Sequence, residues 1–234
     1  MAEKLFSVLD VYRETVAHTA AMNMAIDEAL LEQATLPLIR FYDWKSPALS
    51  FGYFGRFAEV ARYAGERDMV RRWTGGGIVF HGEDLTYGLV IPSADKFFAE
   101  SSMSIYEKVH KALSDVLTRT GRSAVMAKHG PRFTSSTARG GAASADYGCF
   151  SNPVSADVLL DGQKIAGAAQ RRTRRGLLQQ GSIQGVELQP NLREQFAEAL
   201  STGCRERTIH QEILDRAGEL AQQKYAAKTW LRKR

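Results

Sequence analysis

Residues 71 to 81 read Arg71-Arg72-Trp73-Thr74-Gly75-Gly76-Gly77-Ile78-Val79-Phe80-His81, so three consecutive glycines stand directly before a short apolar stretch. A backbone without Cβ atoms can approach a bulky group closely or adopt a positive φ. The alternation that follows predicts a hairpin, with strands at residues 78–81 and 85–91 around a turn at 82–84. The glycines then lie at the mouth of this hairpin, either as a bulge that bends the sheet or as the wall of a ligand site.

The glycine triplet differs from the two common phosphate-binding motifs. No Lys-Ser or Lys-Thr pair follows it, which excludes a P-loop. The glycines are contiguous and lead into a strand rather than a helix, which excludes the dinucleotide-binding fingerprint.

The pattern along the chain predicts a mixed α+β fold. Helical periodicity covers residues 15–34, and Ser104-Ile105-Tyr106-Glu107 has the form of a capping box that opens another helix. Strands dominate the middle, and the segment from about 191 to 234 is predicted to be helical with a break at Gly203. We therefore predict one domain over residues 1–234, with a largely antiparallel sheet flanked by helices.

Composition narrows the partners and the location. The 234 residues are 44% hydrophobic and 24% charged, and no apolar run is long enough to cross a membrane. With no signal peptide evident and two distant cysteines, Cys149 and Cys204, we expect a cytoplasmic protein with free thiols and no metal site. The net charge of +5 fits an acidic protein partner, whereas basic clusters without interleaved aromatic residues argue against nucleic acid.

A second segment combines a turn, a lysine and a run of small side chains. Asp161-Gly162 between two apolar stretches predicts a hairpin, and Lys164 follows the turn on its second strand. Residues 166–169 carry almost no side-chain bulk, so they could form a slot for a long, thin ligand beside the lysine. The alternative is a surface lysine that protects an edge strand from aggregation. Strand alternation predicts one face shared by Lys164, Ala166, Ala168 and Gln170.

Cys149 ends a small, polar stretch without periodicity at residues 130–148, which is predicted to be a long loop. A buried structural cysteine is the common case. A thiol beside a loop and near several cations could instead act as a nucleophile. No histidine is adjacent in the sequence, so His81 and Lys164 are the candidate bases.

Together these segments resemble a known family, the lipoate–protein ligase A and octanoyltransferase family of cofactor transferases related to biotin–protein ligases. The resemblance rests on the Arg71–His81 stretch, on Gly162-x-Lys164-Ile-Ala-Gly167-x-Ala-Gln170 and on Leu178-x-x-Gly181-Ser182-Ile183, in this order. It implies the biotin/lipoate ligase catalytic-domain fold, which is similar to class II synthetases. It also implies transfer of octanoyl or lipoyl groups to a lysine of a lipoyl-carrier domain.

The resemblance assigns roles to individual residues. Lys164 resembles the active-site lysine of the family, whose ammonium would stabilise the oxyanion of acyl transfer. Two departures concern the polar groups: Gly82 follows His81 where the family usually has an acidic residue, and Gln180 stands where histidine is frequent. The residues expected to bind the acyl substrate are Arg72, Thr74, Gly75, Gly76, Gly77, His81, Gly167, Ala168, Ala169, Gln180 and Ser182.

Cys149 decides the branch of the family to which the chain is most similar. ATP-dependent ligases typically have an Asn-Asp pair in this region, whereas Tyr147-Gly148-Cys149-Phe150 resembles the octanoyltransferases, whose nucleophile is the cysteine of a Cys-Phe pair at this place. That branch takes octanoate from acyl carrier protein, holds it as a thioester and needs no ATP or other cofactor. The implied acceptors are the glycine-cleavage H protein and the E2 subunit of 2-oxoacid dehydrogenases.

Three alternatives remain from the sequence. One is an ATP- and Mg²⁺-dependent lipoate–protein ligase, which would not depend on Cys149. Another is an amidotransferase that moves octanoate between lipoyl-carrier proteins through the same thioester. The third is a binding module that has kept the fold without the chemistry.

Overall fold

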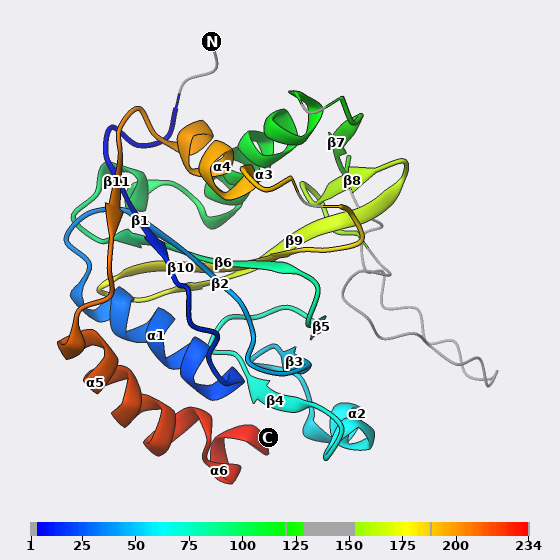
Figure 1. The fold of residues 1–234 in the computed structure, drawn as a ribbon, viewed down its shortest axis with the longest axis vertical. Coiled ribbons are helices and arrows are strands. Elements are labelled where there is room, and N and C mark those ends of the chain that lie inside the picture. Colours follow the sequence, from blue (N-terminus) through cyan, green and yellow to red (C-terminus); the bar gives the residue numbers. More distant parts are fainter. Residues whose placement is uncertain (1–3, 120, 129–152, 188, 234) are drawn as a thin grey trace.

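The computed structural model describes residues 4–119, 121–128, 153–187 and 189–233, and these residues form two sheets with helices on both sides (Figure 1). The larger sheet has eight described strands, and its neighbours pair antiparallel except at β1, which runs parallel to both β11 and β2. In spatial order they are β11 (Cys204–Arg207), β1 (Leu9–Arg13), β2 (Leu38–Tyr42), β6 (Leu85–Pro92), β10 (Gly176–Ile183), β9 (Gln163–Arg172), β8 (Val158–Leu160) and β7 (Ala124–Met126).

The smaller sheet explains why the predicted hairpin after the glycines is wrong. It consists of β4 (Asp68–Arg71), β3 (Ala48–Phe51) and β5 (Ile78–His81) in that order. β5 pairs with β3, whereas β6 pairs with β2 and β10 in the larger sheet. Residues 82–84 therefore carry the chain from one sheet to the other, since alternation shows that a segment is a strand but does not identify its partner.

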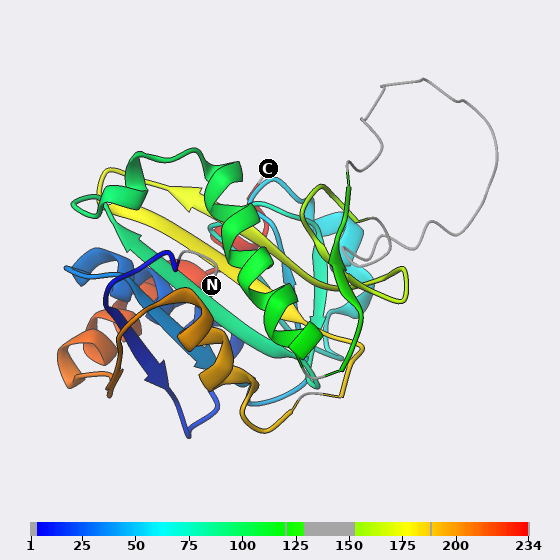
Figure 2. The ribbon, with the colours of Figure 1, turned by 90° about the horizontal axis from the view of Figure 1, so that it is seen from above.

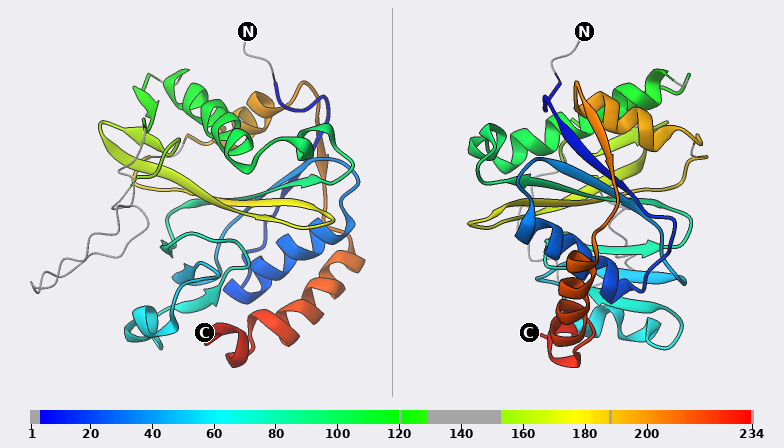
Figure 3. Two further views of the ribbon diagram at one scale, coloured as in Figure 1. Left: turned by 180° about the vertical axis from the view of Figure 1, so that it is seen from behind. Right: turned by 60° about the vertical axis from the view of Figure 1, so that its left-hand side comes forward.

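Helices cover the two faces of the larger sheet differently (Figures 2 and 3). One face is covered by α3 and α4, and the other by α1 and the smaller sheet, while α5 packs on the side of α1 that faces away from the larger sheet (Figure 1). The described helices are α1 (Ala20–Gln33), α2 (Phe57–Val60), α3 (Ser102–Arg119), α4 (Leu192–Leu200), α5 (Gln211–Leu220) and α6 (Lys228–Leu231), with the 3₁₀ turns η1 (Ala61–Tyr63) and η2 (Lys96–Ala99) and the π-helical turn η3 (Ala221–Tyr225). The core is accordingly split into a cluster under α3 and α4 and a cluster under α1 and α5.

Local sequence accounts for the helix starts. Thr19 caps α1 because its side-chain oxygen accepts a hydrogen bond from the Met22 amide. Ten of the fourteen residues of α1 are buried, because the larger sheet and α5 enclose the helix. α3 begins at Ser102, and the Ser101 hydroxyl accepts from the Ser104 amide at 3.1 Å. The predicted cap at Ser104 is therefore wrong by one turn, since Ser101 offers the same hydroxyl earlier.

The C-terminal segment contains a strand that periodicity did not reveal. Gly203 was predicted to separate two helices, but β11 follows it and pairs parallel with β1. Its residues, Cys-Arg-Glu-Arg, are all exposed at the sheet edge, so they carry no apolar alternation. The predicted organisation as a single domain stays a prediction, while the mixed, largely antiparallel sheet flanked by helices is confirmed.

Candidate active site

A cavity lies between the larger sheet, the smaller sheet and the start of α1, and the space between its atoms is about 450 Å³ with the open solvent at its mouth included. Strands β9 and β10 form one wall, and β3, β5 and the glycine segment form the other. Nine of the predicted site residues line it: Arg72, Gly76, His81, Lys164, Gly167, Ala168, Ala169, Gln180 and Ser182. The other lining residues are not among the predicted site residues; they are Met24, Tyr42, Trp44, Ser50, Val79, Thr86 and Gly181.

The glycine segment is held against both walls. Gly76 has φ +84°, and a Cβ there would come within 3.3 Å of the Ala169 Cβ and 3.1 Å of Arg72 Nη2. Gly52 lies directly under the segment, since a Cβ at Gly52 would be 2.1 Å from the Gly76 carbonyl oxygen. Gly75, Gly77 and Thr74 do not line the cavity but shape the segment that does: Arg72 Nη2 donates to the Gly75 and Gly77 carbonyls at 3.0 and 2.8 Å.

The two adjacent arginines have separate surroundings. Arg72 faces the cavity, whereas Arg71 is buried and donates five hydrogen bonds to backbone carbonyls. Two of these carbonyls follow β3, at Tyr53 and Gly55, and three belong to the C-terminal turn at residues 230–233. The Trp230 indole donates back to the Arg71 carbonyl at 2.9 Å. Arg71 therefore fastens the C-terminal turn to the strand that leads into the glycine segment.

Lys164 and two partners form what we call the lysine cluster: Lys164, Asp157 and Tyr106. Lys164 Nζ lies 2.8 Å from Asp157 Oδ2, and both side chains are buried. The Tyr106 hydroxyl donates to Asp157 Oδ1 at 2.5 Å and accepts from the Ala168 amide at 3.0 Å. The pKa of Tyr106 is raised, chiefly by burial, so its hydroxyl stays protonated and keeps donating to the carboxylate.

A β-bulge sets the direction of Lys164 and makes the predicted face wrong. Across β8 and β9, Val158 pairs with Ala166 and Leu159 with Lys164, so Ile165 is an extra residue. Ile165 and Ala166 both enter the core under α3, and Lys164 instead lies over Gly167. A Cβ at Gly167 would be 2.6 Å from Lys164 Cε, so glycine at this position gives the lysine its place. The turn itself is as predicted, with positive φ at Asp161 and Gly162.

The opposite wall holds what we call the histidine cluster: Ser50, Arg72, His81 and Asp84. His81 Nδ1 lies 2.7 Å from Asp84 Oδ2, and His81 Nε2 lies 2.7 Å from Ser50 Oγ. Arg72 Nη1 donates to Ser50 Oγ at 2.6 Å. Burial lowers the pKa of His81, while the pKa of Asp84 falls to about 2 because hydrogen bonds to the carboxylate outweigh its burial.

Neighbouring side chains fix the histidine cluster in place. Ser182 and Thr86 each donate to Asp84 Oδ2 at 2.7 Å, and the Trp44 indole donates to Thr86 at 2.8 Å. The Trp44 ring also stacks on the His81 imidazole, with 4.0 Å between the ring centroids. Asp84 thus supplies the acidic partner of His81 that Gly82 cannot supply.

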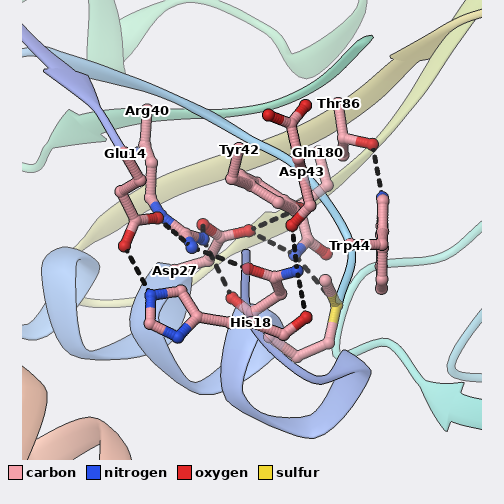
Figure 4. A network of polar contacts seen from close by, with 11 residues as sticks. Glu14, His18, Asp27, Arg40, Tyr42, Asp43, Trp44, Thr86 and Gln180 are labelled. Carbon is pink, nitrogen blue, oxygen red and sulfur yellow. Dashed lines mark hydrogen bonds and ion pairs between the residues drawn. The ribbon is translucent and has the colours of Figure 1, made fainter. Parts of the chain in front are cut away.

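A third polar network anchors the floor of the cavity (Figure 4). The Thr74 hydroxyl donates to Gln180 Oε1 at 2.8 Å, and Gln180 Nε2 donates to Asp27 Oδ2 at 2.7 Å. Arg40 Nη1 in turn donates to Asp27 Oδ1 at 2.8 Å, and Arg40 also pairs with Glu14. Burial raises the pKa of Asp27, and Arg40 acts against that shift. Gln180 therefore ties the glycine segment to a buried ion pair on α1 and β2.

Other predicted features fall outside this geometry. Cys149 and the loop at residues 130–148 lie outside the described residues. Cys204 is exposed on β11, far along the sheet from β9. Within the described ranges, no group of histidine, cysteine, aspartate or glutamate is arranged to hold a metal ion, and no described helix is long and apolar enough to cross a membrane.

The two clusters contain residues that are not among the site residues predicted from the sequence, including Ser50, Asp84 and Asp157. Asp157 directly precedes the strand that leads to the lysine turn, and this position was the available signal. Ser50 and Asp84 act through contacts between segments, Ser50 with His81 thirty-one residues away and Asp84 with Ser182 ninety-eight residues away. Ser50 has no local signal, whereas Asp84 does, because it lies three residues after its partner His81.

Comparison with known proteins identifies the family. The model of the lipoyl protein ligase A/B catalytic domain matches residues 19–223. The octanoyltransferase LipM of Oceanobacillus iheyensis is 36% identical over 180 residues, and that of Brevibacillus brevis is 32% identical over 180 residues. Each alignment covers 74% of this chain, and it covers 62% and 64% of the two relatives, so the chain spans a little under two thirds of their length.

Solved structures show the same fold. Protein Ta0514 from T. acidophilum, with bound lipoic acid, superposes with a TM-score of 0.72 at 22% identity, covering 96% of this chain and 98% of that one. A lipoate-protein ligase A bound with ATP gives 0.69 at 21% identity, covering 97% and 98%. The predicted resemblance is therefore confirmed, and the chain belongs to the lipoyl protein ligase A/B catalytic domain family.

Proposed function

We propose that this protein is an octanoyltransferase of protein lipoylation, which moves an octanoyl group from acyl carrier protein to a lysine of a lipoyl-carrier domain through a thioester on Cys149. One observation carries the proposal: Lys164, held by Asp157, lines a narrow cavity in a chain that is 36% identical to an octanoyltransferase LipM. We expect these steps to take place in the cytoplasm.

The cavity suits a thin acyl chain. Gly76, Gly167, Ala168 and Ala169 line it with little or no side chain, so the backbone itself can lie against the ligand. Each methylene of an octanoyl group buried there would contribute about 0.8 kcal/mol of binding free energy. The polar groups of the histidine cluster are hydrogen-bonded to one another, so they need no polar partner from the acyl chain of the ligand.

The chemistry divides into two acyl transfers. In the first, the Cys149 thiolate attacks the thioester carbonyl of the donor, a new C–S bond forms, and the carrier thiol leaves with a proton. In the second, the acceptor lysine amine attacks the Cys149 thioester, the amide forms, and the Cys149 thiol is released. Both steps develop negative charge on the carbonyl oxygen, which the Lys164 ammonium would stabilise.

The Lys164–Asp157 pair prepares that stabilisation. Asp157 accepts from Tyr106 and from the Val154 amide as well as from Lys164, so its carboxylate is held from three sides. A carboxylate fixed in this way orients the ammonium before the substrate arrives. The proposed role of Asp157 is positional, since it acts through Lys164.

Intact-mass measurement after incubation with octanoyl-acyl carrier protein tests the proposal. We expect one octanoyl adduct, which disappears in Cys149→Ala and persists in Cys204→Ala, a matched control at an exposed thiol. An adduct that survives Cys149→Ala would contradict the thioester.

Two further incubations test the other donors. Octanoate with ATP and Mg²⁺ tests the ligase reaction, which would modify the acceptor without Cys149. An octanoylated lipoyl domain as donor tests amide-to-amide transfer. Modification of the acceptor with only one of the three donors identifies the acyl source.

A further inference from the structure

We propose that Ser50, His81 and Asp84 form a second acyl-transfer centre, a Ser–His–Asp triad that hydrolyses short-chain acyl esters without Cys149. Nothing in the octanoyl transfer proposed above uses these groups as reactants. The proposal stands on the geometry of the histidine cluster, so its outcome does not depend on whether Cys149 carries an acyl group.

The distances match those of a nucleophile, a base and an orienting carboxylate. Ser50 Oγ lies 2.7 Å from His81 Nε2, and His81 Nδ1 lies 2.7 Å from Asp84 Oδ2. A triad is recognised by this chain of hydrogen bonds rather than by fold or residue order. Ser50 and His81 both line the cavity, so a ligand carbonyl inside it can reach the hydroxyl.

The carboxylate fixes the position of the proton. Asp84 has a pKa of about 2, so at neutral pH it is ionised and can accept hydrogen bonds but not donate them. His81 Nδ1 therefore carries the hydrogen, and Nε2 presents a lone pair to Ser50. The Ser50 hydroxyl then donates to Nε2. Burial also lowers the pKa of His81, which keeps the ring neutral and able to accept the proton.

A cation and an aromatic ring complete the arrangement. Arg72 Nη1 donates to Ser50 Oγ at 2.6 Å, so a positive charge stands beside the oxygen that becomes the nucleophile. This charge favours an alkoxide and the oxyanion that follows it. Trp44 stacks on the imidazole and prevents the ring from turning away from Ser50.

The reaction follows from these positions. Ser50 Oγ attacks the ester carbonyl, a C–O bond to Ser50 forms, and the ester C–O bond breaks. The Ser50 proton passes to His81 Nε2 and then to the departing alkoxide. Water then attacks the Ser50 ester and loses its proton to His81. The C–O bond to Ser50 breaks, the carboxylic acid leaves, and His81 returns the proton to Ser50 Oγ. A short acyl ester is the expected substrate, because it can bring its carbonyl to Ser50 without filling the cavity.

The test is carried out in the Cys149→Ala protein, so that any acyl transfer is independent of that thiol. p-Nitrophenyl butyrate reports hydrolysis, and a fluorophosphonate probe reports the reactive serine, which peptide mass mapping then locates. We expect the probe on Ser50 and loss of both signals in Ser50→Ala. Ser114→Ala, at a buried hydroxyl on α3 that donates to the Ala124 carbonyl, serves as the matched control and should retain both.

Asp84→Asn separates catalysis from folding. It keeps the side-chain shape but no longer fixes the His81 tautomer, so kcat for ester hydrolysis should fall by about 10³-fold or more. Circular dichroism of each variant shows whether it is folded. A label on any other residue, or equal hydrolysis by folded Ser50→Ala, would show that the cluster serves only to join the two sheets.

Discussion

The lysine cluster and the histidine cluster face the same cavity but are built in opposite ways. Lys164 is placed by backbone geometry: a bulge at Ile165 and the absence of a side chain at Gly167. His81 is placed by side chains, with Asp84, Ser50 and Trp44 on three sides. The lysine cluster holds the Lys164 side chain ready for a substrate, whereas the polar groups of the histidine cluster hydrogen-bond to one another. Substitutions in the lysine cluster should therefore reduce the rate of octanoyl transfer more than comparable substitutions in the histidine cluster.

The largest effect is expected from Lys164→Ala. Octanoyl transfer should fall by about 10²- to 10³-fold in kcat, as for removal of an oxyanion donor. The change also leaves Asp157 buried without its ion-pair partner, so the free energy of unfolding should drop by about 3–5 kcal/mol. Steady-state kinetics and urea unfolding measure the two effects. Lys111→Ala, at an exposed lysine on α3, is the control, and equal kinetics for both variants would contradict the role of Lys164.

Acid titration is expected to give the next largest effect. Burial lowers the pKa of His110 to about 4, while the unfolded chain takes up that proton near pH 6.5. The unfolded state thus binds more protons between these values, so stability is lost as the pH falls from about 6.5 to 4. The loss should be about 3 kcal/mol from His110, and His81 acts in the same direction.

Urea unfolding at pH 7, 5.5 and 4.5 measures this dependence. His110→Gln should flatten the curve in part, because His81 remains. Below pH 4 a further loss of stability should follow from Asp84. Its pKa is about 2 in the folded protein, so the unfolded chain takes up this proton at a higher pH than the folded protein does. Stability that stays constant from pH 6.5 to 4.5 would contradict the burial of neutral His110.

Asp157→Asn tests whether the lysine cluster works by orientation. The amide keeps the shape but loses the charge, so kcat for octanoyl transfer should fall by roughly 30-fold, equivalent to about 2 kcal/mol. The KM for the octanoyl donor should stay within about twofold, because the side chain does not line the cavity. A rise in KM with constant kcat would show a binding role instead.

Gly167→Ala should have the smallest effect on turnover. Its Cβ would lie 2.6 Å from Lys164 Cε, so the flexible lysine must shift, and kcat should fall by about tenfold. Gly218→Ala is the matched control, because its added Cβ meets no atom within 4 Å and α5 should gain about 0.5–1 kcal/mol. Equal activity of the two variants would show that the position of Lys164 is not critical.

The sequence predicted the family, the fold class and most of the cavity wall. Strong local signals carried these predictions: the glycine triplet, the Asp161-Gly162 turn and the small residues beside Lys164. Each depends on backbone conformation that few residue types can adopt, which is why the pattern is readable.

The remaining features depend on contacts that a single sequence does not encode locally. One extra residue at Ile165 reverses the strand alternation, and no composition signal marks it. The pairing of β5 with β3 rather than β6 is a choice between equally apolar strands. Asp157 and Ser50 become site residues through partners in other elements, so sequence spacing could not identify them.

Arg71 makes the C-terminal turn part of the same cooperative unit as the glycine segment. Its guanidinium is solvated by carbonyl oxygens in place of water, three of them from residues 230–233. If that turn detaches, a buried cation loses most of its solvation shell at the residue next to Arg72. Detachment of residues 230–233 would thereby disturb the lining of the cavity, although more than 150 residues separate the two along the sequence.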